Sequence, residues 1–142
     1  MLKVYLAGAV RGTSGRWRDE IPAIPGVLFM HPGAEIPGPD PELRTELYTP
    51  ADRLAVRHCD ILLAYCDRIE GGHGTAAEIG MAVALGKELL VVCPTEASRY
   101  VWRFAAGCTP QVCTSLAQAV EIIRYAAAQV GGAARCAAEP VR

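Results

Sequence analysis

The sequence lacks several features that would place it in a specialised class of protein. Its formal net charge of −1 over 142 residues gives no basic surplus of the kind that binding to nucleic acid or a membrane surface requires. No apolar run approaches the roughly 20 residues of a membrane-spanning helix. No basic segment followed by a long apolar stretch opens the chain, so a signal peptide is not expected. We therefore expect a cytoplasmic protein with neither a nucleic-acid nor a membrane partner.

Metal-binding and disulfide patterns are also missing. The six cysteines form no C-x-x-C pair. In an apolar sequence without a secretory signal, such cysteines are typical of reduced, mostly buried thiols. We expect no metal site.

Apolar runs alternate with helical patterns, which is typical of a parallel sheet covered by helices. Strands are expected at residues 3–7, 27–30, 60–65, 88–93 and 111–113, and helices at 14–21, 50–58, 75–85, 97–106 and 115–130. Thr49 would cap the helix that Pro50 opens, and Gly131-Gly132 would end the last helix. The length predicts one domain, at residues 1–131, with a frayed tail at 132–142.

The position of a ligand site follows from this pattern. In an open parallel sheet, ligands bind beyond the C-terminal ends of the strands, where the strand order reverses. For a five-stranded order 2-1-3-4-5, that crevice lies between the first and third strands. Gly8 ends the first strand and the third runs into the glycine-rich loop Glu70–Gly74. The two turns should converge on one crevice.

The glycine-rich loop leads directly into a helix that carries Glu78. Glycines let the backbone approach a ligand closely, and a helix start offers free N–H groups with partial positive charge. A carboxylate in the first turn should stay ionised and, facing a crevice, could act as a nucleophile. A structural interpretation also exists, because the segment Thr75–Glu78 fits a capping box. A simple cap, however, does not need the glycines that precede it.

Other candidate residues each allow a structural and a functional interpretation. Asp52 either complements the dipole of its own helix or serves the site. Tyr5 lies mid-strand like a core tyrosine, and a nearby carboxylate would be a suitable partner for its hydroxyl. His73 either faces solvent or touches a ligand, and His31 is either a loop histidine or a ligand contact at the sheet edge.

Aromatic and basic residues elsewhere are treated in the same way. Trp102 and Phe104 are interpreted as packing or subunit-contact residues. The turn at residues 11–18 carries Trp17 among three arginines. That turn fits either a grip on an anion or a solvated basic turn.

Three ordered segments together resemble the nucleoside 2-deoxyribosyltransferase family, which includes the 2′-deoxynucleoside 5′-monophosphate N-glycosidases. They are V-Y-L-A-G from Val4, D-x7-D-I-L-L-A from Asp52, and G-T-x-x-E-I-G-x-A-x-A-x-G-K from Gly74. The resemblance implies a flavodoxin-like, doubly wound α/β fold of three layers with the sheet order 2-1-3-4-5. It also implies a homo-oligomer whose sites are completed by a neighbouring subunit.

The resemblance assigns roles to particular residues. Glu78 would be the nucleophile on C1′ of the deoxyribose, Tyr5 would orient its carboxylate, and Asp52 would hold the sugar or assist proton transfer to the base. The substrates would be a deoxynucleoside and a free base, with no metal or organic cofactor. With the loop and edge residues discussed above, the candidate substrate contacts are Gly8, Ala9, His31, Glu70, Gly72, His73 and Gly74.

The sequence departs from the family at two places. In many transferases an aspartate lies six residues before the nucleophile, where this chain has Gly72, and Glu70 could reach in instead. The monophosphate hydrolases tend to place a serine there and another near Trp102, so both losses argue against a phosphorylated substrate. Arg11-Gly12, however, resembles those hydrolases.

Three alternatives therefore stay open beside base exchange. The first is hydrolysis of 2′-deoxynucleosides or their 5′-monophosphates. The second rests on Gly71–Glu78, which is similar to the P-G-G-x-G-T-x-x-E signature of cytokinin-activating phosphoribohydrolases, although Glu70 replaces the proline. The third is a non-catalytic nucleotide-binding module in which Glu78 is only a cap.

Overall fold

Parallel strands form the centre of this computed structural model, which describes residues 1–10, 13–31 and 45–137. In spatial order the five strands of the sheet are β2 (Val27–Met30), β1 (Leu2–Gly8), β3 (Ile61–Tyr65), β4 (Glu88–Val92) and β5 (Val112–Cys113). Every neighbouring pair is parallel. The predicted α/β fold with the order 2-1-3-4-5 is therefore confirmed. The order reverses between β1 and β3, where Gly8 lies opposite Tyr65.

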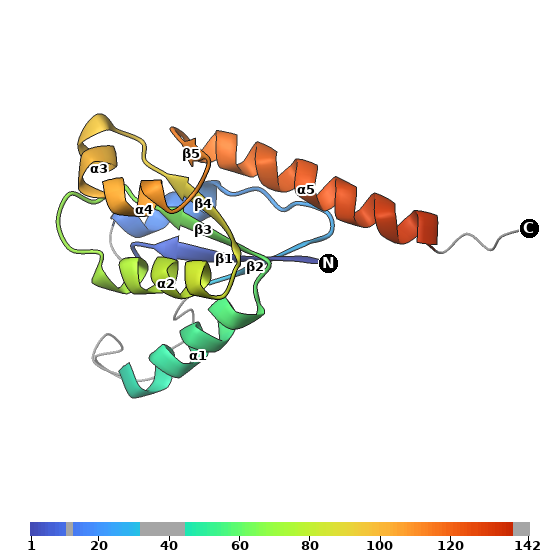
Figure 1. The fold of residues 1–142 in the computed structure, drawn as a ribbon, viewed down its shortest axis with the longest axis horizontal. Helices are drawn as coiled ribbons and strands as arrows, with labels where there is room; N and C mark the ends of the chain where they lie inside the picture. The colour runs from blue at the N-terminus through green and yellow to red at the C-terminus, as the bar shows by residue number, and fades with distance from the viewer. Residues whose placement is uncertain (11–12, 32–44, 138–142) are drawn as a thin grey trace, which may run out of the picture.

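Helices cover both faces of the sheet (Figure 1). They are the 3₁₀ helix η1 (Thr13–Glu20) and the α-helices α1 (Thr45–His58), α2 (His73–Ala84), α3 (Glu96–Val101), α4 (Arg103–Gly107) and α5 (Leu116–Ala137). Among the helices of the described residues, none has the length and apolar character needed to cross a membrane.

Alternation along β1 divides the core into two clusters. Val4 and Leu6 pack on the face covered by η1 and α5, whereas Tyr5 and Ala7 pack on the face covered by α1, α2 and α4. Successive side chains of a strand point to opposite faces, so one buried strand supplies both clusters. This alternation directs Tyr5 toward α2.

Two predicted helix boundaries near Pro50 and Gly131 are wrong. Helix α1 is already formed at Thr45 and contains Pro50 in its interior, where the proline removes one backbone hydrogen bond but does not end the helix. Helix α5 runs through Gly131 to Ala137, since glycine in a helix costs only about 1 kcal/mol and alanines follow. Part of the predicted tail is thus helical, and residues 138–142 lie outside the described range.

The predicted helix at residues 97–106 is divided into α3 and α4, with Trp102 between them. Thr95 caps α3, and its side chain and that of Ser98 form a reciprocal capping box. This arrangement starts the helix before the predicted boundary. The predicted proline-rich loop at residues 32–41 and the Arg11-Gly12 pair lie outside the described residues.

The end of β1 is shaped by Gly8. Its φ of 150° is unfavourable for other residues, and a Cβ atom there would lie 3.0 Å from both Trp17 Cζ2 and the Tyr65 carbonyl oxygen. The Trp17 ring stacks on Tyr65 with 5.0 Å between centroids. Its Nε1 donates to the Ala9 carbonyl at 3.2 Å. Helix η1 therefore closes tightly over the ends of β1 and β3, and only glycine leaves room for it.

Gly8→Ala should lower the free energy of unfolding by ~1–3 kcal/mol, because the backbone is strained and Trp17 must move. Chemical denaturation measures the change. Gly80→Ala is the control, since a Cβ atom on this exposed α2 residue meets nothing within 4 Å. The control should stabilise by roughly 0.5–1 kcal/mol. Equal stability of Gly8→Ala and the unmodified protein would show that η1 does not press on Gly8.

Candidate active site

A hydrogen bond joins the sheet to α2 at the centre of the site. The Tyr5 hydroxyl donates to Glu78 Oε1 at 2.7 Å. Tyr5 is fully buried, whereas Glu78 keeps part of its side chain accessible. The two residues lie 73 positions apart in the chain, so the fold itself brings them together. One carboxylate oxygen is thereby held in place by the strand.

Glu78 does not cap its helix. The N-cap of α2 is Gly72, with φ of 85° and no capping bond from a side chain. Helix α2 therefore begins two residues before Thr75, and Glu78 falls in the second turn. The capping-box interpretation is wrong. The residue that precedes α2 has left-handed backbone, which glycine adopts readily and Thr75 does not. Glu78 is free to point toward Tyr5.

The electrostatic state of Glu78 differs from the prediction. Burial raises its pKa from 4.5 to about 7. The hydrogen bond from Tyr5 lowers the pKa, the negative charge of Asp52 raises it, and the positive charge of Arg18 lowers it. The expectation that this carboxylate stays fully ionised is wrong, because burial in the folded protein disfavours its charged form.

Tyr5 acts only as a donor to this carboxylate. Burial raises the pKa of its phenol, and the neighbouring Glu78 and Asp52 carboxylates raise it further. The hydroxyl therefore keeps its proton at every physiological pH, and a neutral donor beside a carboxylate forms a strong charge-assisted hydrogen bond.

Asp52 and His31 complete the group of charges. Asp52, on α1, is half-buried and close enough to raise the pKa values of both Tyr5 and Glu78. His31 directly follows β2, and partial burial together with the charge of Arg18 lowers its pKa. The structure thus gathers Tyr5, Glu78, Asp52 and Arg18, with His31 beside Arg18.

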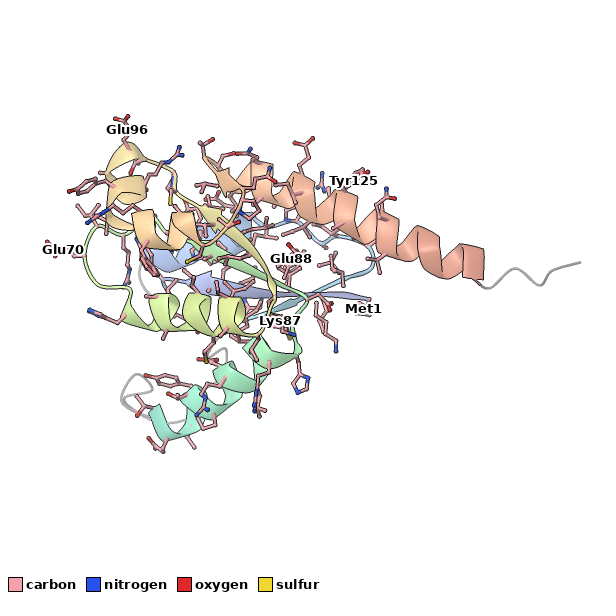
Figure 2. All side chains as sticks on the ribbon, in the orientation of Figure 1. Met1, Glu70, Lys87, Glu88, Glu96 and Tyr125 are labelled. Carbon is pink, nitrogen blue, oxygen red and sulfur yellow. The ribbon has the colours of Figure 1, made fainter. Side chains whose placement is uncertain are left out.

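Three candidate residues of the glycine-rich loop and the start of α2 are open to solvent. Glu70, His73 and Gly74 are exposed, and Figure 2 shows Glu70 on the outer side of the loop, directed away from the sheet. The structure does not bring Glu70 to the Tyr5–Glu78 pair. The substrate contacts proposed for these loop residues stay predictions.

Gly72 and Trp102 fit together where the family usually has other residues. Trp102 is buried and its Nε1 donates to the Arg68 carbonyl at 2.8 Å. A Cβ atom on Gly72 would lie 2.6 Å from Trp102 Cζ2. An aspartate at position 72 is therefore incompatible with this tryptophan. Trp102 is a packing residue, as predicted, whereas Phe104 is 86% exposed.

Arg18 is the site residue whose role the sequence left unresolved. Its Nη2 donates to the carbonyls of Leu6 and Gly8 at 2.9 and 3.3 Å, and its Nη1 donates to that of Ala9. The Ala9 carbonyl is thus turned to Arg18 and Trp17. For Arg18 the interpretation as a solvated basic turn is wrong. The sequence did contain a signal for this role. Trp17 and Arg18 are adjacent in a crossover too short for a long helix, and such a pair is expected to pack on the end of the strand.

Comparison with known proteins identifies the family of the chain. A family model described as nucleoside 2-deoxyribosyltransferase matches residues 30–124. The chain belongs to this family. The resemblance inferred from the sequence is thereby confirmed. A comparison with curated proteins gives no match. Within the described residues of this deoxyribosyltransferase-family protein, no group of three or more His, Cys, Asp or Glu side chains could hold a metal ion.

Solved structures share the fold. One is the 2-desoxiribosyltransferase from Leishmania mexicana, which is 25% identical with a TM-score of 0.51. The match covers 67% of this chain and 66% of that one, so the chain spans slightly less than two thirds of the Leishmania protein. A conserved protein from Enterococcus faecalis V583 is 19% identical with a TM-score of 0.67, covering 85% of this chain and 96% of that one. This second likeness is one of fold alone.

Glu78→Gln should make the protein more stable at pH 8. The folded-state pKa of about 7 exceeds the ordinary 4.5, so the folded protein holds this proton more tightly than the unfolded chain. That stabilisation is fully present below pH 4.5 and is lost as the pH rises through about 7. Glutamine keeps an oxygen for Tyr5 without the charge. The Tm should therefore exceed that of the unmodified protein at pH 8, and the gap should narrow toward pH 5.

The matched control is Glu121→Gln, which removes an exposed carboxylate from α5. Its Tm should follow that of the unmodified protein across the same pH range. If Glu78→Gln gave no gain at pH 8, the carboxylate would not be desolvated in the folded state.

Proposed function

We propose that this protein is a nucleoside 2-deoxyribosyltransferase that exchanges the base of a 2′-deoxyribonucleoside through a deoxyribosyl ester of Glu78. The observation that carries the proposal is the 2.7 Å hydrogen bond from Tyr5 to Glu78 Oε1. It lies in a chain of the corresponding family, at the place where the strand order reverses. The Leishmania relative is named for the same transfer.

The first step forms the ester. Oε2 of Glu78 bonds to C1′ as the bond from C1′ to the base nitrogen breaks, and the electron pair of that bond leaves with the base. Asp52 takes up a proton from solvent when the substrate binds and donates it to the departing base, which leaves as the neutral base. Positive charge builds on the sugar before the new bond is complete, and the carboxylate stabilises it. A substrate without a 2′-hydroxyl forms this cation more easily.

The second step reverses the first with a different base. A nitrogen of the incoming base attacks C1′, the ester bond breaks, and its electron pair returns to Glu78. The proton released by the incoming base passes back to Asp52. Two displacements at one carbon restore the original configuration, so the product is again the β-nucleoside.

Tyr5 fixes the orientation of the Glu78 carboxylate during both steps. Its hydroxyl holds Oε1, which leaves Oε2 for the sugar. The bond persists after ester formation, because Oε1 then becomes the carbonyl oxygen and still accepts a hydrogen bond. A fully buried tyrosine cannot follow a moving carboxylate, so the nucleophile attacks from one fixed direction.

A homo-oligomer belongs to the proposal. Tyr100, Val101 and Phe104 form an apolar surface on α3 and α4, with exposed fractions of 70%, 43% and 86%. These residues flank Trp102, which supports the glycine-rich loop at Gly72. A neighbouring subunit seated there would reach the open side of the site.

Hydrolysis is the second candidate function, and Gly72 is the observation that favours it. This position carries no carboxylate to manage the proton of an incoming base, and Glu70 is directed away from the site (Figure 2). If the incoming base were held poorly, water would take its place at the ester. Trp102 occupies the space behind Gly72, which favours a nucleoside over its monophosphate.

Incubation with deoxyinosine and adenine tests the proposal. The expected product is deoxyadenosine, which is detected by chromatography. Glu78→Ala should abolish its formation, whereas Glu121→Ala should not. Free base and deoxyribose without new nucleoside would establish hydrolysis instead. Deoxynucleoside monophosphates are tested in parallel for release of sugar phosphate. No turnover of any substrate would contradict the proposal and favour a nucleotide-binding module.

Tyr5→Phe should reduce kcat by up to about a hundredfold, because the carboxylate is no longer held in the direction of attack. Its KM should change less. Loss of the hydrogen bond also raises the pKa of Glu78, so the acid limb of the rate profile should move to higher pH. Tyr125→Phe removes the hydroxyl of an exposed tyrosine and is the control. An unchanged rate and profile in Tyr5→Phe would make Tyr5 a core residue only.

A further inference from the structure

Strand β1 extends beyond its neighbour β2. The last paired residues of the two strands are Tyr5 and Met30. The Leu2 N–H bonds to the Gly26 carbonyl, so the even-numbered residues of β1 present their polar backbone groups on the β2 side. The carbonyls of Leu6 and Gly8 therefore face the edge beyond Met30, where β2 has ended. Buried carbonyls of this kind need another donor.

Arg18 supplies the missing donors. Its Nη2 donates to both the Leu6 and Gly8 carbonyls, and Nη1 donates to the Ala9 carbonyl. The guanidinium Cζ also lies 4.5 Å from the centroid of the Trp17 ring. A planar group with several N–H donors can bridge adjacent carbonyls in this way, whereas an ammonium presents a single point of contact. The end of β1 is thus held by a side chain of η1 in place of a strand.

The same guanidinium places a positive charge beside the nucleophile. Among residues 1–10, 13–31 and 45–137, the charged or titratable groups that face Glu78 are Tyr5 from β1, Asp52 from α1 and Arg18 from η1, with His31 after β2 beside Arg18. Arg18 supplies the cation of this group. Its Nε is buried without a hydrogen-bond partner among the described residues. A cation buried to this degree is stabilised by a nearby anion, and it stabilises that anion in return.

We propose that Arg18 is a positioning residue for the transfer reaction, with two separable actions. Its fork of donors fixes the backbone at Gly8 and Ala9, on which the sugar lies. Its positive charge favours the ionised form of the Glu78 carboxylate, the form that attacks the sugar. The inference rests on the proposed function for the reaction, but its electrostatic part is a property of the protein without substrate.

Two substitutions separate the actions. Arg18→Lys keeps the charge and loses the fork, so kcat/KM should fall while the acid limb of its pH profile stays in place. Arg18→Met keeps an apolar stem and loses the charge, so the acid limb should also move to higher pH. Arg16→Met is the control, because Arg16 is exposed on the same 3₁₀ helix. It should leave both the rate and the profile unchanged.

The pKa of Glu78 is measured without turnover by carbon NMR of protein labelled at the glutamate carboxyl, with Glu78→Gln to assign the signal. The pKa should rise in Arg18→Met and stay near that of the unmodified protein in Arg18→Lys. If Arg18→Met does not fold, Arg18→Gln, which keeps a neutral donor, replaces it. An unchanged pKa in a folded, uncharged variant would overturn the inference, even if base exchange is observed. Absence of any turnover by the unmodified protein would instead contradict the proposed function.

Discussion

The hydrogen bond from Tyr5 to Glu78 connects a buried strand to the helix that faces it, and the rest of the site is arranged around it. The donor is fully buried and the acceptor is on α2, at the face of the sheet opposite α5. Because β1 is paired on both sides as far as Tyr5, the hydroxyl has little freedom to move. A carboxylate that accepts a hydrogen bond from this hydroxyl is therefore also restricted in its movement. Helix α2 therefore brings Glu78 to the sheet, and the Tyr5 hydroxyl on β1 determines which of its oxygens stays available.

The buried position of Glu78 disfavours ionisation of its carboxyl group. Burial raises the pKa of Glu78 to about 7, and Asp52 adds a second negative charge nearby. The Tyr5 hydrogen bond and the Arg18 charge act in the opposite direction. A carboxylate balanced in this way is poorly solvated yet ionised in part at neutral pH, which suits a nucleophile that must bond to carbon. Positive charge developing on a bound sugar would shift the balance further toward the carboxylate.

Much of this arrangement could be predicted from the sequence. Alternating apolar runs were enough for a parallel sheet, and the ordered motifs around Tyr5, Asp52 and Glu78 were enough for the family, whose resemblance implied the strand order. The helix starts were predicted less well. Thr49-Pro50 and Thr75 both carry the local chemistry of a helix cap, but tertiary packing extends α1 and α2 beyond these residues. Local capping preferences amount to about 1 kcal/mol, which packing readily outweighs. The contacts of Arg18 with three carbonyls depend on where β2 ends, and no local pattern reports that.

The displaced start of α2 changes which groups affect the ionisation of Glu78. Had the helix begun at Thr75, Glu78 would lie in the first turn, where the free N–H groups favour a negative charge. Trp102 instead packs against Gly72, the backbone turns through left-handed glycine there, and the helix starts at His73. Glu78 then loses the benefit of the helix terminus. The charge of Arg18 on η1 lowers the pKa of Glu78 and offsets part of the effect of burial, and its guanidinium lies at the edge beyond the end of β2. The glycine-rich loop and the arginine of the first crossover thus both affect the ionisation of Glu78, although some fifty residues of chain lie between them.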